Sequence, residues 1–286
     1  MAARHRKRPA PVGSSRLNRL PATIIALIGV GLLLYPSAAS WFSAREHADS
    51  LDSYATAVAR LPDAQREALL ARAHAYNDDL GTQTLRDPYA TDGGVDEDDA
   101  ADYDAQLRLD GSDTMATIRI PSVHIVLPIR HGTAAATLDQ GVGHLLGSSL
   151  PVGGSGTNAV LTGHSGLANA SMFTPLHQVR QGDRVDIDVL GEQLVYRVVQ
   201  IETVLPTETD LLSAVPGHDY LTLITCTPIG VNSHRLVIRA ERVAADDLPA
   251  ANAALTEDGV PFPWWIVAAV AVGLGTIGNL ARRGRR

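Results

Sequence analysis

The run Thr222-Leu223-Ile224-Thr225-Cys226 has the composition of a β-strand and ends on the only cysteine of this 286-residue chain. Residues 227–233 contain Pro and Gly and predict a loop, and residues 234–238 predict the start of the next strand. Neighbouring antiparallel strands lie about 4.8 Å apart, so Cys226 and Arg235 can face one site. Taken alone, a lone cysteine is more often a small buried hydrophobe. The cation beside it favours a reactive thiol instead.

A thiol nucleophile needs ionisation, stabilisation of the charge it creates, and a proton for the leaving group. A free thiol has a pKa of about 8.5, and a nearby His or Arg raises its ionised fraction. Attack on a carbonyl creates an oxyanion, which a cation can stabilise, and His can protonate a departing amine. We therefore consider Cys226 the candidate nucleophile, Arg235 the cation, and His164, in the Gly-flanked segment Leu161–Gly166, the acid and base.

Short strands separated by turns are predicted from residue 115 onward, which is typical of an all-β sandwich or barrel. Turn-forming segments at residues 151–156, 181–183, 190–192 and 228–230 separate them. The expected strands are Met115–Ile120, His124–Ile129, Asn158–Thr162, Arg184–Leu190, Gln193–Leu205, Tyr220–Cys226 and His234–Arg242.

The remaining histidines indicate no metal centre. His144 is expected to be structural, and His124, His131, His177 and His218 lack the mutual spacing of metal ligands. No dinucleotide fingerprint or P-loop is present, so we expect neither a metal nor a cofactor. Residues 205–209, Leu-Pro-Thr-Glu-Thr, are interpreted as a loop that can line a substrate groove.

Two apolar segments, residues 20–42 and 262–280, predict membrane helices, because about 20 apolar residues suffice to cross a bilayer. Arginines and a lysine precede the first segment and arginines follow the second. The positive-inside rule then places both termini in the cytoplasm and the middle of the chain outside the cell. The alternatives are a signal peptide cleaved near residues 38–40 and a buried core helix at the C-terminus.

The middle of the chain carries the net acidic balance, since basic residues gather at the ends of a chain with formal net charge −7. Nucleic-acid binding is therefore not expected. Residues 43–80 predict helix, which Gly81 ends. The stretch Asp92–Asp104 predicts a solvated acidic loop, and its spacing does not fit a calcium-binding EF-hand.

Several motifs together resemble the sortase family. Residues 222–226 are similar to its Thr-Leu-x-Thr-Cys signature, Thr162-Gly163-His164 resembles its histidine segment, and Arg235 falls where its arginine lies. The resemblance extends from about residue 118 to residue 239. Within it, residues 128–133, 141–145 and 225–236 are most like class C sortases, which polymerise pilins.

This resemblance implies a mainly β fold, a closed sortase β-barrel with N-terminal helices, a lid loop and two flanking transmembrane helices. It also implies a cysteine transpeptidase that cleaves a sorting signal of the Leu-Pro-x-Thr-Gly type through a thioester. A lysine amine of a second pilin then forms an isopeptide bond. The family roles carry over to Cys226 as nucleophile, His164 as acid and base, and Arg235 as substrate and oxyanion stabiliser. Thr225 and Asn232 are substrate-groove candidates.

Class C sortases carry an N-terminal lid with Asp-Pro followed by an aromatic residue, and Asp87-Pro88-Tyr89 resembles it, although Phe or Trp is more usual than Tyr. We expect Asp87 to pair with Arg235 and Tyr89 to cover the thiol. An ordinary turn is the alternative.

The expected boundaries follow the chain in order. They are a basic tail (1–19), a membrane helix (20–42), a helical segment (43–80), the lid and acidic loop (81–113), the barrel (114–243), a linker (244–261), a membrane helix (262–280) and a basic tail (281–286).

Two other functions remain open at this point. One is a housekeeping sortase that attaches surface proteins to peptidoglycan precursor. The other is a non-enzymatic, membrane-tethered β-domain in which Cys226 is only a core residue.

Overall fold

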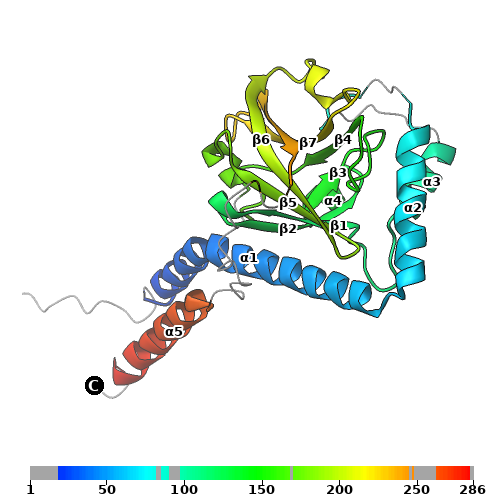
Figure 1. The fold of residues 1–286 in the computed structure, drawn as a ribbon. Coiled ribbons are helices and arrows are strands. Elements are labelled where there is room, and N and C mark those ends of the chain that lie inside the picture. The colour runs from blue at the N-terminus through cyan, green and yellow to red at the C-terminus, as the bar shows by residue number, and fades with distance from the viewer. Residues whose placement is uncertain are drawn as a thin grey trace, which may run out of the picture. The chain divides into compact units, whose positions relative to one another are not determined.

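The fold is described by a computed structural model that covers residues 19–81, 85–89, 97–167, 170–244, 247 and 262–283 (Figure 1). The chain divides into two compact units, residues 39–261 and residues 1–38 with 262–286. The basic N-terminal tail before residue 19, residues 90–96 of the acidic region and most of the expected linker lie outside the described residues.

An eight-stranded closed barrel forms the body of the larger unit, with its strands in the order β1-β2-β3-β4-β7-β8-β6-β5. Two pairs are parallel, β2 with β3 and β4 with β7, and the other pairs are antiparallel. Closure leaves no strand edge unpaired. The strands are β1 (Ala116–Ile120), β2 (Ile125–His131), β3 (Val142–His144), β4 (Thr157–Thr162), β5 (Arg184–Val189), β6 (Glu192–Val204), β7 (Asp219–Thr227) and β8 (His234–Arg242). The closed barrel implied by the resemblance is confirmed.

Helices precede and interrupt the barrel. The described helical elements are α1 (Arg19–Arg60), α2 (Asp63–Asp79), α3 (Glu97–Ala105), η2 (Pro121–Val123), α4 (Ala135–Leu138), η3 (Thr174–Gln178), η4 (Asp210–Leu212) and α5 (Trp264–Arg283). Pro62, in extended conformation, separates α1 from α2, because proline cannot continue the hydrogen bonding of the preceding helix. The C-terminal part of α1 is fixed to the barrel by Tyr54, whose hydroxyl donates to the Met115 carbonyl (3.1 Å) and accepts from the Leu190 N–H (2.8 Å).

Strand alternation divides the apolar side chains of β7 and β8 between two clusters. Leu221, Leu223 and Ile238 are fully buried in the main core. Ile224 and Val237 belong to a second, smaller cluster on the other face of the sheet. Cys226 follows Ile224 by two positions and therefore shares its face, not that of the main core.

Three details of the predicted strands were wrong. Strand β3 was not predicted, because it has only three residues and one of them is a glycine, which weakens a strand pattern. A Cβ at Gly143 would collide with the Gly132 carbonyl oxygen, so glycine is required at this close approach. His124 (φ 54°) and Leu190 (φ 49°) were expected in strands but adopt left-handed conformations that end their segments.

The acidic stretch is not a loop throughout. Residues 97–105 form α3, whereas residues 92–96 lie outside the described residues. Tyr103 explains the difference, because its side chain is 2% exposed and its hydroxyl donates to the His144 carbonyl (2.9 Å) and contacts His144 Nδ1 (2.9 Å). These tertiary contacts of Tyr103 stabilise a helix in a segment whose high charge alone favours a solvated loop.

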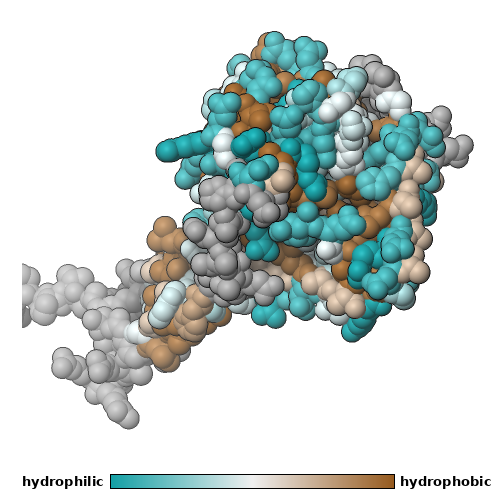
Figure 2. All heavy atoms as spheres, in the orientation of Figure 1, coloured by the Kyte–Doolittle hydropathy of each residue, from teal (hydrophilic) through white to brown (hydrophobic). Residues whose placement is uncertain are grey.

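The smaller unit contains α1 up to residue 38 and helix α5, whereas the rest of α1 belongs to the larger unit. Among the described residues, one helix, Thr23–Arg60, is long and apolar enough to cross a membrane, and Trp264–Thr276 is a shorter apolar helix. Leu32 and Leu33 in α1 are 71% and 80% exposed. In Figure 2, hydrophobic residues dominate the N-terminal part of α1 and helix α5, whereas the visible barrel surface is mostly hydrophilic.

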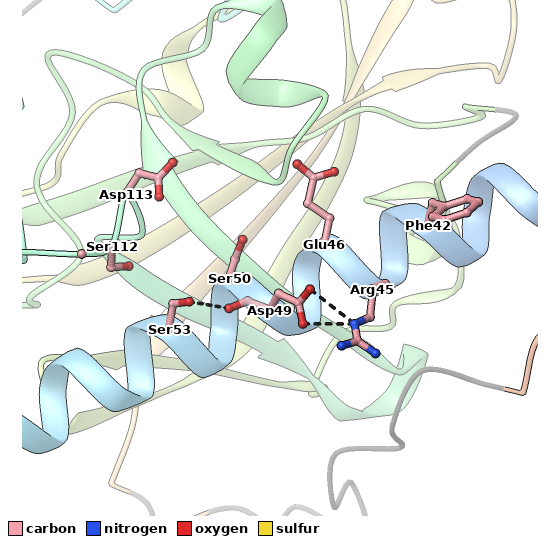
Figure 3. Close-up of a pocket in the computed structure, with 9 residues that line it drawn as sticks. Phe42, Arg45, Glu46, Asp49, Ser50, Ser53, Ser112 and Asp113 are labelled. Carbon is pink, nitrogen blue, oxygen red and sulfur yellow. Dashed lines mark hydrogen bonds and ion pairs between the residues drawn. The ribbon is translucent and has the colours of Figure 1, made fainter.

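A polar hollow of about 460 Å³ lies between α1 and the turn that precedes β1 (Figure 3). Arg45 and Asp49 form an ion pair along one wall (3.1 Å), and Ser53 donates to the Asp49 carbonyl (2.7 Å). Asp113 lies on the opposite wall. None of the site residues predicted from the sequence lines this hollow.

Candidate active site

Cys226 and Arg235 are brought together by the register of β7 and β8, in which they are direct partners. Directly opposed residues of an antiparallel pair project to the same face of the sheet. Both residues are 9% exposed. The sequence therefore located the thiol and the guanidinium correctly relative to each other, because a single loop connects their strands.

His164 lies in the turn that leaves β4, and hydrogen bonds on both sides attach this turn to the Cys226 strand. Before His164, the Gly163 N–H donates to the Ile224 carbonyl (3.2 Å), and the Thr225 hydroxyl donates to the Gly163 carbonyl (2.7 Å). After it, the Ser165 hydroxyl donates to the Cys226 carbonyl (2.5 Å). The parallel pairing of β4 with β7, invisible in the sequence, is what places this turn beside the cysteine.

Two residues near His164 were not identified from the sequence. The His164 Nε2 lies 3.9 Å from an Asp139 carboxylate oxygen, in the segment between α4 and β3. Ser165 was quoted only as part of the histidine segment. Neither residue has a local sequence signal, because each acts through a contact between segments that are distant in the chain.

The segment Asp87-Pro88-Tyr89 lies directly against the site. Asp87 accepts two hydrogen bonds from Arg235, from Nε and from Nη2, both at 2.8 Å. The remaining guanidinium nitrogen, Nη1, donates to the carbonyls of Asn232 and His234 (both 3.1 Å). The pairing is bidentate, and both side chains are 11% exposed. The Asp87 carboxylate therefore occupies the pair of guanidinium donors (the Arg235 fork) that would otherwise be available to another ligand.

The Tyr89 ring lies between the basic groups of the site. The Arg235 guanidinium carbon is 4.9 Å from the ring centroid, and the His164 ring centroid is 6.1 Å away. The Tyr89 hydroxyl donates to the Gly163 carbonyl (2.7 Å), the same oxygen that Thr225 contacts. Burial raises the pKa of Tyr89 well above its usual value, so the phenol is a neutral donor here. Pro88 is buried.

The electrostatics of the thiol reflect this arrangement. Burial raises the pKa of the Cys226 thiol above its ordinary value, the Arg235 charge lowers it, and the Asp87 carboxylate raises it again. The hydrogen bonds to Asp87 raise the pKa of Arg235. In this state the thiol is mostly protonated and the cation is neutralised by Asp87.

The two groove candidates lie on either side of Cys226 and differ in character. Thr225 is fully buried and contacts the His164 turn through its hydroxyl. Asn232 is exposed and adopts a left-handed conformation (φ 59°), and its carbonyl accepts from Arg235. Thr225 and Asn232 therefore contact the site through hydrogen bonds to Gly163 and Arg235.

His144 is fully buried. Its ring contacts the Tyr103 hydroxyl and the Ser149 carbonyl (2.8 Å). Burial lowers the pKa of His144 to about 4. In the described part of the chain, no group of three or more His, Cys, Asp or Glu side chains is arranged to hold a metal ion.

Part of the chain matches a known protein family. Residues 118–243 match the model of the sortase domain. Among curated proteins, sortase A of Streptococcus agalactiae is 29% identical over 140 residues, which cover 48% of this chain and 56% of that protein.

The solved structures that resemble this chain include class C sortases. Sortase C-1 from Actinomyces oris is 47% identical, with a TM-score of 0.59, and the match covers 63% of this chain and 99% of that one. Sortase C1 from Streptococcus agalactiae is 36% identical, with a TM-score of 0.63 and coverages of 69% and 98%. Sortase A from Corynebacterium diphtheriae is 44% identical, with a TM-score of 0.62 and coverages of 69% and 91%. The chain therefore belongs to the sortase family and is most similar to its class C members.

Proposed function

We propose that this protein is a membrane-anchored cysteine transpeptidase that joins pilin subunits. The observation that carries the proposal is the β7–β8 register that pairs Cys226 with Arg235, together with the hydrogen bonds that attach the His164 turn to Cys226. The neighbours named sortase C-1 and sortase C1 support the pilin-joining class.

The acylation step assigns one task to each residue. The Cys226 thiolate attacks the Thr–Gly carbonyl of a Leu-Pro-x-Thr-Gly-type signal, and Arg235 stabilises the resulting oxyanion. His164 donates a proton to the departing glycine amine. The Thr–Gly bond breaks, and a thioester to Cys226 forms.

The second step transfers the acyl group to an amine. A lysine amine of another subunit attacks the thioester, a base takes its proton, and the thiolate leaves. An isopeptide bond forms, the thioester C–S bond breaks, and the Cys226 thiolate is regenerated beside a protonated His164. His164 is the base, since the residue that donated the first proton is then able to accept the second.

The lid residues regulate access in this proposal. While Asp87 occupies the Arg235 fork, the guanidinium cannot meet an oxyanion, and the Tyr89 ring lies over the site. The segment that contains Asp87 and Tyr89 must therefore leave before substrate binds. The proposed location is the cell membrane, with the barrel outside and both termini in the cytoplasm.

A pilin polymerisation assay tests the function. The full-length enzyme in detergent micelles is incubated with a purified pilin that carries a sorting signal, and the products are separated after boiling in SDS. We expect a ladder of covalent multimers that Cys226→Ala abolishes. Attachment only to peptidoglycan precursor would favour the housekeeping alternative, which the relatives named sortase A make worth testing. Normal assembly by Cys226→Ala would support the non-enzymatic alternative.

A further inference from the structure

Asp139 places an exposed carboxylate at the edge of the proposed active site. It follows α4 (Ala135–Leu138), and its Oδ1 lies 3.9 Å from His164 Nε2. This separation is too long for a hydrogen bond between N and O, which extends to about 3.2 Å. The Asp139 side chain is 68% exposed, whereas that of His164 is 27% exposed. The carboxylate therefore lies close enough to His164 to contact the same ligand and remains open to solvent.

The backbone around Asp139 is held against the barrel. The Asp139 N–H donates to the Ala135 carbonyl (2.9 Å), and Leu138 is 2% exposed. Two residues after Asp139, a Cβ atom at Gly141 would come within 2.8 Å of the Pro128 carbonyl oxygen in β2. Glycine permits this close approach of two backbone segments. The position of the Asp139 carboxylate is therefore set by packing on both sides of it.

The His164 turn is fixed to a comparable degree. The His164 carbonyl accepts a hydrogen bond from the Phe173 N–H (3.0 Å). The next residue, Ser165, donates through its hydroxyl to the Cys226 carbonyl (2.5 Å). The Asp139 carboxylate and the His164 imidazole thus belong to two separately anchored segments, which keeps the distance between them nearly constant.

The side chains beside Asp139 on its own helical turn do not compete for the carboxylate. Residues three and four positions apart are neighbours on a helix, and the residues at these positions before Asp139 are Ala136 and Ala135. Both are exposed. A methyl group neither donates a hydrogen bond nor carries charge, so the approach to Asp139 from this side is open and the carboxylate is available to a cation.

A single nitrogen atom can contact both groups. If it lies about 2.8 Å from Asp139 Oδ1 and from His164 Nε2, the three atoms form a triangle whose longest side is the observed 3.9 Å. A lysine side chain is protonated at neutral pH, since its pKa is about 10.4, and it carries three N–H donors. One donor can bind Asp139 and a second can bind His164, while the third points elsewhere.

We propose that Asp139 binds the ammonium group of the acceptor lysine and holds it beside His164 for attack on the thioester. This inference rests on the proposed function and identifies a recognition residue for its second substrate. The third N–H loses its proton to water, and the lone pair that remains attacks the thioester carbonyl. As the C–N bond forms and the C–S bond breaks, His164 takes the proton of the N–H that it contacts. The third hydrogen, bound to Asp139, stays on the isopeptide nitrogen.

Asp139→Asn tests the inference because it keeps the shape of the side chain and removes its charge. The full-length enzyme in detergent micelles is mixed with a Leu-Pro-x-Thr-Gly peptide as donor and a purified pilin without its sorting signal as acceptor. Asp87→Ala is included in every protein, the parent among them, to open the site. We expect the KM for the acceptor to rise about fourfold, as for the loss of an exposed ion pair. The rate of thioester formation should change by less than about twofold, because the donor peptide does not contact Asp139.

Two further measurements separate acceptor binding from a structural effect on His164. Hydroxylamine is uncharged at neutral pH and also cleaves a thioester, so its rate should be equal in the parent and in Asp139→Asn. Added salt should raise the acceptor KM of the parent more than that of Asp139→Asn, because salt screens exposed charges. Asp139→Glu, which retains the charge, should show a smaller rise in KM than Asp139→Asn.

The matched control is Glu192→Gln, which neutralises another exposed carboxylate of the barrel. Glu192 is the first residue of β6, whereas the last, Val204, is the register partner of Arg235. The control therefore lies at the far end of that strand from the proposed active site, and its acceptor KM should equal that of the parent.

The failures of the two proposals are distinguishable. If the parent joins the peptide to the pilin and the acceptor KM of Asp139→Asn is unchanged, Asp139 does not bind the acceptor and the inference is overturned. Equal slowing of thioester formation and of the hydroxylamine reaction in Asp139→Asn would also overturn it, because Asp139 would then act only on His164. If the parent forms no thioester, or forms one and transfers it to no lysine, the proposed function itself fails and this inference fails with it.

Discussion

The Cys226 thiol is subject to opposing influences at the scale of single residues. Burial and the Asp87 carboxylate raise its pKa, whereas Arg235 lowers it. Because Asp87 also occupies two donors of Arg235, one carboxylate both disfavours the thiolate and neutralises the cation that would stabilise it. Asp87 therefore acts on the two groups that attack requires. We therefore propose that the lid segment inhibits the site electrostatically as well as covering it.

Asp87→Ala should lower the pH at which the thiol becomes reactive. Removing the carboxylate removes one influence that raises the thiol pKa and leaves Arg235 free to lower it. The rate of alkylation by iodoacetamide, measured against pH, should show a lower midpoint and be faster at pH 7, because the thiolate fraction is larger there. Asp63→Ala, which removes an exposed carboxylate on α2, is the control. An unchanged midpoint would contradict the role of Asp87.

The hydroxyl and the ring of Tyr89 contact the site separately, so their effects on access to Cys226 can be measured one at a time. Tyr89→Phe removes the hydrogen bond to the Gly163 carbonyl and keeps the ring, whereas Tyr89→Ala removes both. If the ring covers the thiol, Tyr89→Ala should speed alkylation several-fold. Tyr89→Phe should have a smaller effect, because it loses only the contacts of the hydroxyl with the Gly163 and Ile224 carbonyls and keeps the ring. Equal rates in the parent and Tyr89→Ala would show that the ring does not protect Cys226.

At the scale of elements, sequence reasoning succeeded where pattern and proximity were sufficient. The β7–loop–β8 unit was predictable because its strands are well patterned and close in sequence. The parallel contact of β4 with β7, which brings His164 to Cys226, was available only through the family resemblance. Asp139 and Ser165 were not identified, because their partners lie far away in the chain. Helix α3 was missed because Tyr103 is ordered by tertiary contacts and not by local composition.

The packing of α3 on β3 makes a prediction about acid stability. His144 is fully buried between Tyr103 and Ser149, and its pKa is lowered to about 4. Since the unfolded chain has an imidazole pKa near 6.5, it binds a proton that the folded state excludes between about pH 6.5 and pH 4. Stability is therefore lost as pH falls through this window, by about 3 kcal/mol at pH 4.

His144→Gln removes this titration and keeps a hydrogen-bonding side chain. Urea unfolding of the parent and the variant should be compared at pH 7 and pH 4.5. The variant is expected to be less stable at pH 7, and the difference between the two proteins should shrink at pH 4.5. A difference that stays constant with pH would show that His144 is not the acid-sensitive group.

At the scale of the whole molecule, the proposal requires the barrel and the two termini to lie on opposite sides of a membrane. Helix α1 contains a long apolar stretch. Helix α5 begins with two tryptophans, and the apolar stretch that follows them is shorter than that of α1. Such aromatic residues are enriched at membrane interfaces. The apolar surface of α1 is exposed in the protein itself, which is unfavourable in water and favourable in lipid.

Protease treatment of intact protoplasts tests this topology. Epitope tags at both ends of the full-length chain should survive, because the proposal places both ends in the cytoplasm, while the barrel is digested or becomes accessible to antibodies. Permeabilised protoplasts provide the control, in which both tags should be lost. A C-terminal tag that is digested in intact protoplasts would contradict a second crossing by α5.

The central claim is that Cys226 carries the acyl group during transfer. The Asp87→Ala full-length enzyme is mixed with a Leu-Pro-x-Thr-Gly peptide, quenched in acid after a short time, digested and analysed by mass spectrometry. The account predicts that the peptide fragment ending in Thr is attached to Cys226 and is released by hydroxylamine, and that Cys226→Ala forms no adduct. Cleavage of the peptide with equal efficiency by Cys226→Ala, or an acyl group found on another residue, would contradict it.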